Sequence, residues 1–132
     1  MADINWLAVI VAGLSAFAIG GLWYSPALFS KAWMKDSQLS TDQINSGNKA
    51  VIFGATAIFS LIMAFNLAMF LNDVKTDWQW GMMAGFLAGI WTFCAIAIHS
   101  LFELKSWRLI FINGGYSMVS LIVMGLIIGA WR

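Results

Sequence analysis

The sequence predicts an all-α integral membrane protein whose chain crosses the bilayer four times. Of its 132 residues, 61% are hydrophobic and 10% are charged, whereas a soluble domain usually carries about 25% charged residues. A soluble domain of this size buries too small a fraction of its surface to hide so many apolar side chains. The apolar residues also gather in four long stretches, and we therefore expect lipid to surround them.

The four stretches are residues 4–24, 50–71, 78–102 and 109–131. A helix rises about 1.5 Å per residue, so each stretch is long enough to cross a hydrocarbon core about 30 Å thick. None alternates between polar and apolar residues as a membrane β-strand does. We predict four transmembrane helices in a single domain covering residues 1–132.

The first stretch is expected to remain in the protein as a membrane span rather than to be cleaved as a signal peptide. A signal peptide begins with a basic segment, whereas Met1–Asp3 offers an acidic side chain and no basic one. Its apolar run is also longer than the core of a signal peptide.

The lysines and arginines of the loops predict the orientation, because cytoplasmic loops are enriched in both. The connections after the first and third spans share one side, and their basic residues are Lys31, Lys35, Lys49, Lys105 and Arg108. The opposite side has Lys75 and Arg132. We therefore expect both termini outside the cytoplasm, in a multi-pass protein of the inner (plasma) membrane.

The connection from Ser25 to Lys49 is the one long loop of the predicted bundle. Pro26 should end the first helix, because the residue before a proline is pushed out of the α region. Residues 28–35 then place apolar side chains on one helical face and lysines on the other, which favours a short helix in the cytoplasmic membrane interface. An irregular loop is the alternative. Ser40 or Thr41 can cap a further helix.

Composition also excludes several classes of protein. A net charge of +1 gives no broad basic surface for nucleic acid. The single cysteine, Cys94, excludes an internal disulfide and a disulfide-exchange enzyme. Because the chain has one histidine and no clustered ligands, we expect no metal site. We likewise expect no cofactor.

Glycines mark the predicted packing face of the third span. Gly81, Gly85 and Gly89 recur every four residues, a spacing that allows two membrane helices to approach closely. The fourth span offers Gly125 and Gly129. The sequence leaves open whether the third span meets a helix of the same chain or of another copy. Two such faces in a small bundle favour a homo-oligomer.

Polar residues gather near the predicted cytoplasmic boundary. We expect them to line a polar pocket formed by Tyr24, Lys31, His99, Glu103, Asn113 and Tyr116. Advancing about 100° per residue, His99 and Glu103 return to the face of the glycine stripe. The pocket hypothesis follows from the cost of ionisable groups in a membrane, which usually signals function.

The role of His99 stays open at this stage. It can lock two helices by a hydrogen bond to Asn113 or Tyr116, or exchange protons near neutral pH. Glu103 is either a solvated charge at a helix end or the partner of Lys31 or Arg108. Asn66, in the second span, is expected to form a hydrogen bond between helices.

Several motifs resemble a bacterial family of small four-helix membrane proteins whose members carry a domain of unknown function. The motifs are Trp-Tyr-Ser-Pro at 23–26, Lys-x-Trp at 31–33, His-x-x-Phe-Glu at 99–103 and Ile-Asn-x-Gly-Tyr at 112–116. This resemblance covers nearly the whole chain. It implies the four-helix topology and no assigned reaction.

Three classes of function remain. The first is a small-molecule or proton-linked transport or ligand-binding module that uses the polar pocket. It is not a small multidrug exporter of the kind that relies on a carboxylate in the first helix, because residues 4–24 contain none. The second is an accessory protein that packs against itself or an unknown membrane partner. The third is a small membrane enzyme, which we expect least, and we assign no catalytic residue.

Overall fold

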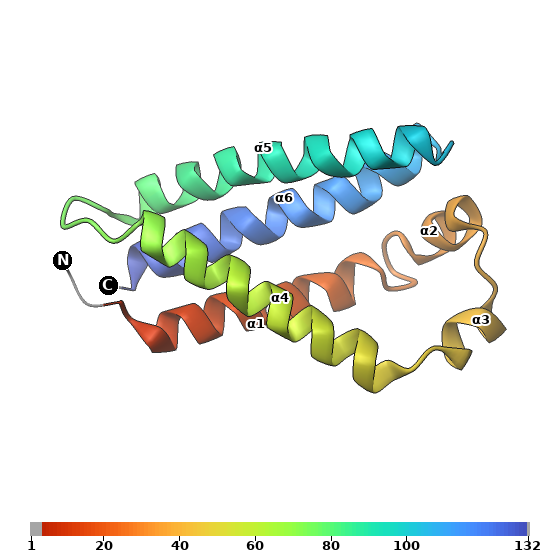
Figure 1. The fold of residues 1–132 in the computed structure, drawn as a ribbon, viewed down its shortest axis with the longest axis horizontal. Helices are drawn as coiled ribbons and strands as arrows, with labels where there is room; N and C mark the ends of the chain where they lie inside the picture. The colour runs from red at the N-terminus through yellow and green to blue at the C-terminus, as the bar shows by residue number, and fades with distance from the viewer. Residues whose placement is uncertain (1–3, 132) are drawn as a thin grey trace.

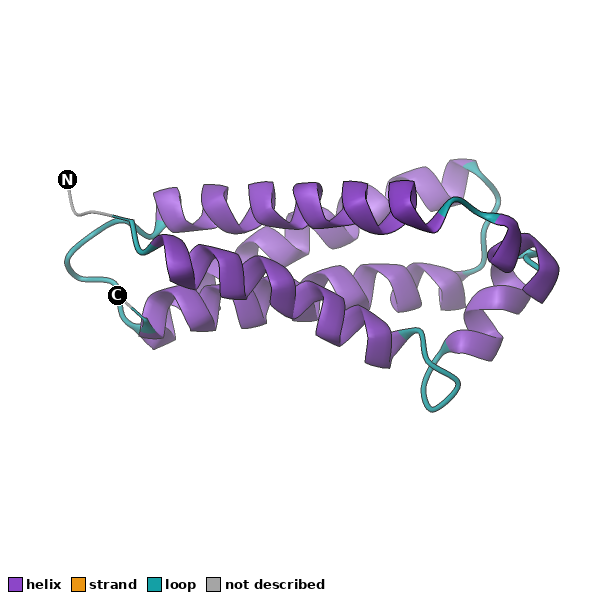
Figure 2. Ribbon diagram, turned by 90° about the horizontal axis from the view of Figure 1, so that it is seen from below, coloured by secondary structure: helices purple, strands orange, loops and turns teal. Residues whose placement is uncertain are grey.

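The computed structural model describes residues 4–131, which form a helical bundle (Figures 1 and 2). Its helices are α1 (Trp6–Trp23), α2 (Ser30–Ser37), α3 (Thr41–Ser46), α4 (Lys49–Phe70), α5 (Trp78–Phe102) and α6 (Trp107–Ala130). Four of them, α1, α4, α5 and α6, are long and apolar enough to cross a membrane. This confirms the predicted four long helices with short helical segments between the first and second. Met1–Asp3 and Arg132 lie outside the described residues. The first segment was used in the prediction that the first span is not cleaved, and Arg132 in the prediction of the orientation.

Each long helix begins at a polar residue whose side chain accepts a hydrogen bond from the backbone of the first turn. These caps are Asn5, Asn48, Asp77 and Ser106. Such a bond satisfies one of the N–H groups that a helix start leaves without an intrahelical acceptor. Of the two candidates for α3, Ser40 is the cap, and it forms a capping box with Gln43.

The described chain termini lie together at one end of the bundle, where the Asn5 side-chain amide donates to the Trp131 carbonyl at 3.1 Å. We call this the terminal end. The other end carries α2 and α3, together with the connection from α5 to α6 (Figure 1), and we call it the α2–α3 end.

The closest helix pair is α5 and α6, and glycines allow their approach. A Cβ atom added to Gly81 would collide with the backbone carbonyl of Gly125, and one added to Gly89 would lie 3.0 Å from the Met118 Cα. A Cβ at Gly129 would lie 2.5 Å from the Asp77 carbonyl oxygen. The glycine stripe of α5 therefore meets α6 of the same chain, which answers the question that the sequence left open.

The remaining long helices pack in the order α5, α6, α1, α4, since α1 lies against both α6 and α4. Gly13 makes the α1–α4 contact close, because a Cβ there would lie 2.8 Å from the Leu61 Cδ2. The buried core lies in the half of the bundle nearer the terminal end, where all four helices contribute. Its residues are Val9, Ala12, Ala16, Ala64, Leu67, Ala68, Leu71, Ala84, Leu121, Met124 and Ile128.

Candidate functional site

Three of the predicted pocket residues meet between α1 and α6 near the α2–α3 end. The Tyr24 hydroxyl donates to the Asn113 Oδ1 at 2.7 Å. The Tyr116 hydroxyl donates to the Ala16 carbonyl at 2.9 Å, and the two tyrosine rings contact edge to face with centroids 5.5 Å apart. Because each hydroxyl already donates to an acceptor of the same chain, these contacts join α1 to α6.

Trp23 adds a bond that the sequence did not predict. Its indole N–H donates to the Ile112 carbonyl at 2.8 Å. Gly115 makes room for the ring, since a Cβ there would lie 3.1 Å from the Trp23 Cζ2. The glycine one turn after Ile112 is the sequence signal that could have indicated this contact.

The short helix α2 is fixed to the bundle by aromatic contacts and an ion pair. The Trp33 ring contacts Tyr24 with centroids 5.4 Å apart. The Asp36 carboxylate accepts hydrogen bonds from the Arg108 Nε at 2.7 Å and from the Ser106 hydroxyl at 2.7 Å. A second Arg108 nitrogen, Nη2, lies 2.5 Å from the Asp36 Oδ1.

These hydrogen bonds stabilise the charged form of Asp36. The Arg108 and Ser106 donors lower the pKa of its carboxyl from 3.8 to about 2. The sequence reasoning did not single out Asp36, which lies 72 positions before Arg108. The sequence left Lys31 and Arg108 open as partners of Glu103. In the structure Arg108 is bound to Asp36 instead.

The other predicted pocket residues are not part of this cluster. Lys31, His99 and Glu103 are exposed, and within residues 4–131 none of them makes a side-chain hydrogen bond or ion pair. A hydrogen bond from His99 to Asn113 or Tyr116, one of the two roles that the sequence left open, is absent among the described residues. Asn66 is also exposed and makes no hydrogen bond between helices within the described part of the chain.

The face of α5 that meets α6 changes along the helix, which explains the position of His99. Gly81, Gly85 and Gly89 are buried against α6, but near the C-terminus of α5 the buried residue is Ser100. Ser100 is one position past His99 and so about 100° further round the helix. The shared register of the glycines with His99 does not persist, because two crossing helices do not contact along a straight line.

A second face of α5 passes from buried to exposed along its length. Ala84 is 4% exposed within the core that contains α4 residues, and Ala88 packs against that core. The same heptad positions continue through Trp91 and Ala95 to Phe102. Trp91 is 83% exposed, Phe102 is 87% exposed and Ala95 is exposed.

The matching face of α4 shows the same change. Leu71 and Leu67 are buried near the terminal end, and Ser60 is buried midway along the helix. At the same spacing, Ala57 is half-buried and Phe53 is 57% exposed. The two helices therefore contribute to one core near the terminal end, and the same heptad positions are exposed near the α2–α3 end.

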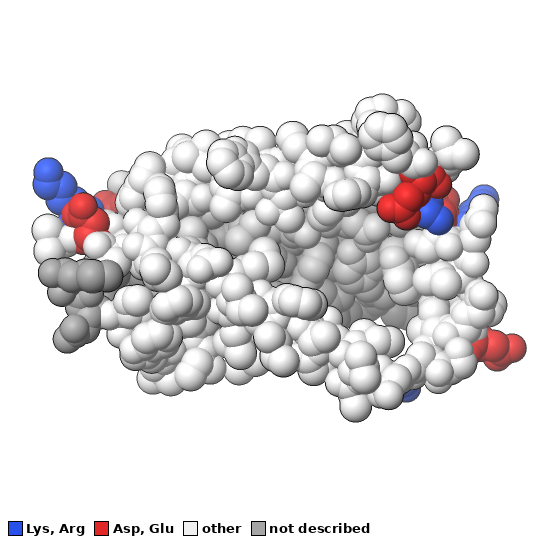
Figure 3. Space-filling view, viewed as in Figure 1, with Lys and Arg blue, Asp and Glu red and all other residues white. Residues whose placement is uncertain are grey.

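The molecular surface is hollowed where α4 and α5 separate (Figure 3). Figure 1 shows α4 diverging from α5 towards the α2–α3 end. On α6, Met124 and Ser120 are buried on the inward face, and the next positions of that face, Ser117 and Asn113, are half-buried. We call the hollow between α4 and α5 the lateral cleft. His99 lies along its α5 wall by helical position, one turn before Glu103.

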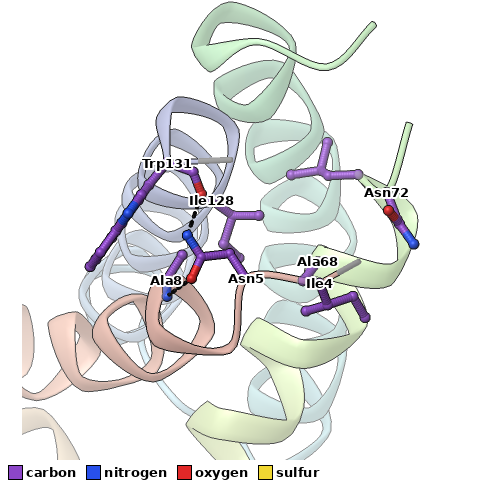
Figure 4. Close-up of a pocket in the computed structure, with 8 residues that line it drawn as sticks. Ile4, Asn5, Ala8, Ala68, Asn72, Ile128 and Trp131 are labelled. Carbon is purple, nitrogen blue, oxygen red and sulfur yellow. Dashed lines mark hydrogen bonds between the residues drawn. The ribbon is translucent and has the colours of Figure 1, made fainter. Parts of the chain in front are cut away.

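A small pocket at the terminal end is a separate feature (Figure 4). Its cavity volume is about 20 Å³, and it is lined by Ile4, Asn5, Ala8, Ala68, Leu71, Asn72, Ile128 and Trp131. This volume holds about one water molecule, so the pocket is too small for a metabolite. Among residues 4–131, no three His, Cys, Asp or Glu side chains are grouped to hold a metal ion.

Four apolar helices of spanning length define the chain as a multi-pass membrane protein. A protein-family model matches residues 7–129, and the chain belongs to that family, described as a protein of unknown function (DUF1761). No curated protein and no solved structure matches the chain. The arrangement of its own side chains is therefore the basis for a functional proposal.

Proposed function

We propose that the protein is a ligand-binding module of the inner membrane, serving transport or sensing of a small molecule, and that the lateral cleft is its site. This proposal rests on the change from buried to exposed side chains along α4 and α5. Heptad positions that are buried near the terminal end are exposed near the α2–α3 end. An uncovered concave surface bordered by a few polar groups is the usual form of a small-molecule site.

The polar groups at the cleft support a site rather than a simple gap in packing. Asn113 accepts a hydrogen bond from Tyr24 through its Oδ1, which orients the amide and leaves its nitrogen to donate. His99 and Glu103 are exposed at the C-terminal end of α5. Placing an ionisable residue in a membrane span costs free energy, and such residues usually mark a functional site. A proton-linked step, if the ligand moves, would use His99.

The glycine faces give little support to a homo-oligomer. Gly81 and Gly125, which motivated that expectation, face each other within one chain. An accessory role remains the alternative, in which a second copy or a partner helix covers the cleft. The test of the cleft distinguishes these two functions.

The proposed orientation places the α2–α3 end in the cytoplasm. That end carries Lys31, Lys35, Lys49, Lys105 and Arg108, whereas Lys75 lies in the loop at the terminal end. A cysteine introduced at Asn45 on α3, in a Cys94→Ser background, should be inaccessible to an impermeant thiol reagent in intact cells. Labelling at Asn45 without permeabilisation would reverse the orientation.

The cleft can be tested by filling it. Ala95 is exposed on the α5 wall, so Ala95→Phe places a ring in the cleft. Ala18 is exposed on the side of α1 opposite its buried face, so Ala18→Phe is the matched control. Each variant is purified in nanodiscs, and native mass spectrometry measures the retained small molecules and the subunit number together.

The expected result is a stoichiometric small molecule retained by the wild type and by Ala18→Phe and lost from Ala95→Phe. Retention by Ala95→Phe would place the ligand elsewhere. A third outcome is that no small molecule is retained and that Ala95→Phe, but not Ala18→Phe, disrupts an oligomer. That outcome would support the accessory function in place of the binding function.

A further inference from the structure

We propose that α2 binds the headgroup of an anionic phospholipid of the surrounding membrane, with Lys31 and Lys35 as the residues that hold its phosphate. This site is separate from the lateral cleft, and the inference does not rest on the function proposed for the cleft. It follows from the side chains that α2 turns outwards and from the depth at which the bundle holds this helix.

The short helix α2 turns its bases outwards and its acid inwards. Of its eight residues, Lys31 and Lys35 are exposed and the other six are half-buried. The two lysines are four residues apart, so they lie on the same face of the helix. Asp36 is the acidic residue of α2, and its side chain is only 11% exposed. The outer face therefore carries two positive charges, and α2 places no negative charge beside them.

Contacts on the opposite side of α2 keep this face turned outwards. The Trp33 ring contacts Tyr24 at the C-cap of α1. One Asp36 oxygen accepts from Ser106 and Arg108, and the other accepts from Arg108. These contacts oppose rotation of the helix about its own axis. Because the face is already ordered, a ligand that binds it loses less free energy in ordering the helix.

The same contacts place α2 at the boundary between membrane and water. The two residues that bind Asp36 flank Trp107, which begins the candidate span α6 and is 62% exposed. Tryptophan favours this boundary. Leu28, before α2, is 48% exposed and Leu39, after it, is 36% exposed. A helix with outward lysines and exposed apolar side chains at both ends is suited to a lipid surface.

The charge of the α2–α3 end favours an anionic headgroup. Its five basic residues outnumber the acidic residues at that end, which are Asp36, Asp42 and Glu103. Asp42 and Glu103 are exposed, but they belong to α3 and to the end of α5. An excess of lysine and arginine close to a membrane attracts anionic lipids. A zwitterionic lipid brings an ammonium group of its own, which the two lysines of α2 repel.

The experiment compares two phospholipids with the same acyl chains, phosphatidylglycerol and phosphatidylcholine. Each is titrated into the delipidated protein in detergent, and native mass spectrometry measures the binding of the first lipid. Lys31→Gln with Lys35→Gln removes the charge of the proposed site. Lys49→Gln with Lys75→Gln is the matched control, since both lysines are exposed and neither lies on α2. Ala95→Phe, which fills the lateral cleft, is the second control.

We expect the wild type to bind phosphatidylglycerol at least fivefold more tightly than phosphatidylcholine. The Lys31/Lys35 variant should reduce this preference below twofold, and both controls should keep it. Raising the salt tenfold should weaken the preference of the wild type, because salt screens charges at a surface.

Four outcomes would overturn the proposal. Equal binding of the two lipids by the wild type would show no selectivity for an anionic headgroup. An equal loss of preference in the Lys49/Lys75 variant would show that net charge alone is responsible. Displacement of the lipid by glycerol phosphate at an equal concentration would assign the site to a soluble anion. A preference lost only in Ala95→Phe would place the lipid in the lateral cleft, and so would support the cleft function while refuting the site on α2.

Discussion

Gly85 shows at the scale of a single residue how closely α5 and α6 approach. A Cβ added at Gly85 would lie 2.8 Å from the carbonyl carbon of Leu121 and 2.9 Å from the Cα of Ile122. These are backbone atoms, which cannot rotate away as the end of a side chain can. The two helices would have to separate to admit even a methyl group.

We therefore predict that Gly85→Ala lowers the free energy of unfolding by about 1–3 kcal/mol, as overpacking of a core usually does. Gly54 is the control, since no heavy atom of the surroundings lies within 4 Å of a Cβ added there. Gly54→Ala should be neutral or stabilising by up to about 1 kcal/mol, because alanine favours the helix. Unfolding in mixed micelles measures both, and equal stability of the two variants would contradict the close crossing.

The bond between Tyr24 and Asn113 gives a second prediction at this scale. Tyr24→Phe removes the hydroxyl that donates to Asn113 and should cost about 0.5–1.5 kcal/mol of unfolding free energy. Asn113→Ala in the Tyr24→Phe background should then cost less than Asn113→Ala alone. Asn66→Ala, at an exposed asparagine, should add independently to Tyr24→Phe. A double-mutant cycle without coupling would show that the hydroxyl does not hold α1 to α6.

At the scale of the element, α2 depends on one carboxylate for its position. Asp36 connects the end of α2 to Ser106 and Arg108 at the start of α6. Because its folded pKa is lowered to about 2, the contact should be fully formed above the ordinary pKa near 4. It should weaken as the pH falls from about 4 towards 2.

We predict that a spin label on a cysteine at Gln38, in a Cys94→Ser background, keeps the same restricted mobility from pH 8 to pH 5 and becomes mobile near pH 2. Asp36→Asn should mobilise it at neutral pH, since the amide cannot form the same ion pair with Arg108. Asp42→Asn, which removes an exposed acid from α3, should leave the label restricted. Mobilisation between pH 7 and pH 5 would show that another group holds α2.

At the scale of the whole molecule, the four long helices share a core at one end of the bundle, and α4 stands apart from α5 at the other. The core residues lie towards the terminal end, while α4 and α5 diverge towards α2 and α3 (Figure 1). In a Cys94→Ser background, a cysteine at Ala95 should react with a lipid-soluble thiol reagent at least tenfold faster than one at Ala84. The reason is that Ala84 is 4% exposed and Ala95 is exposed. Equal protection of the two positions in nanodiscs would show that a partner or a second copy closes the cleft.

The sequence predicted the four long helices because hydropathy and length are local properties of the chain. The caps of the long helices are also local, since a polar side chain and the N–H three residues later lie in one turn. The sequence also placed Tyr24, Asn113 and Tyr116 at a similar depth, because each lies a few residues from the cytoplasmic end of its predicted span. Those three side chains are in contact, which depth alone could not establish.

The tertiary structure decided which helix faces meet. A stripe of small residues indicates a close contact but not its partner, and the pairing of Gly81 with Gly125 became known from the packing of α5 on α6. The exposure of His99 and the pairing of Asp36 with Arg108 depend on crossing angles and on the path of a loop. The cleft itself exists because α4 diverges from α5, and no local pattern in either helix encodes the angle between them.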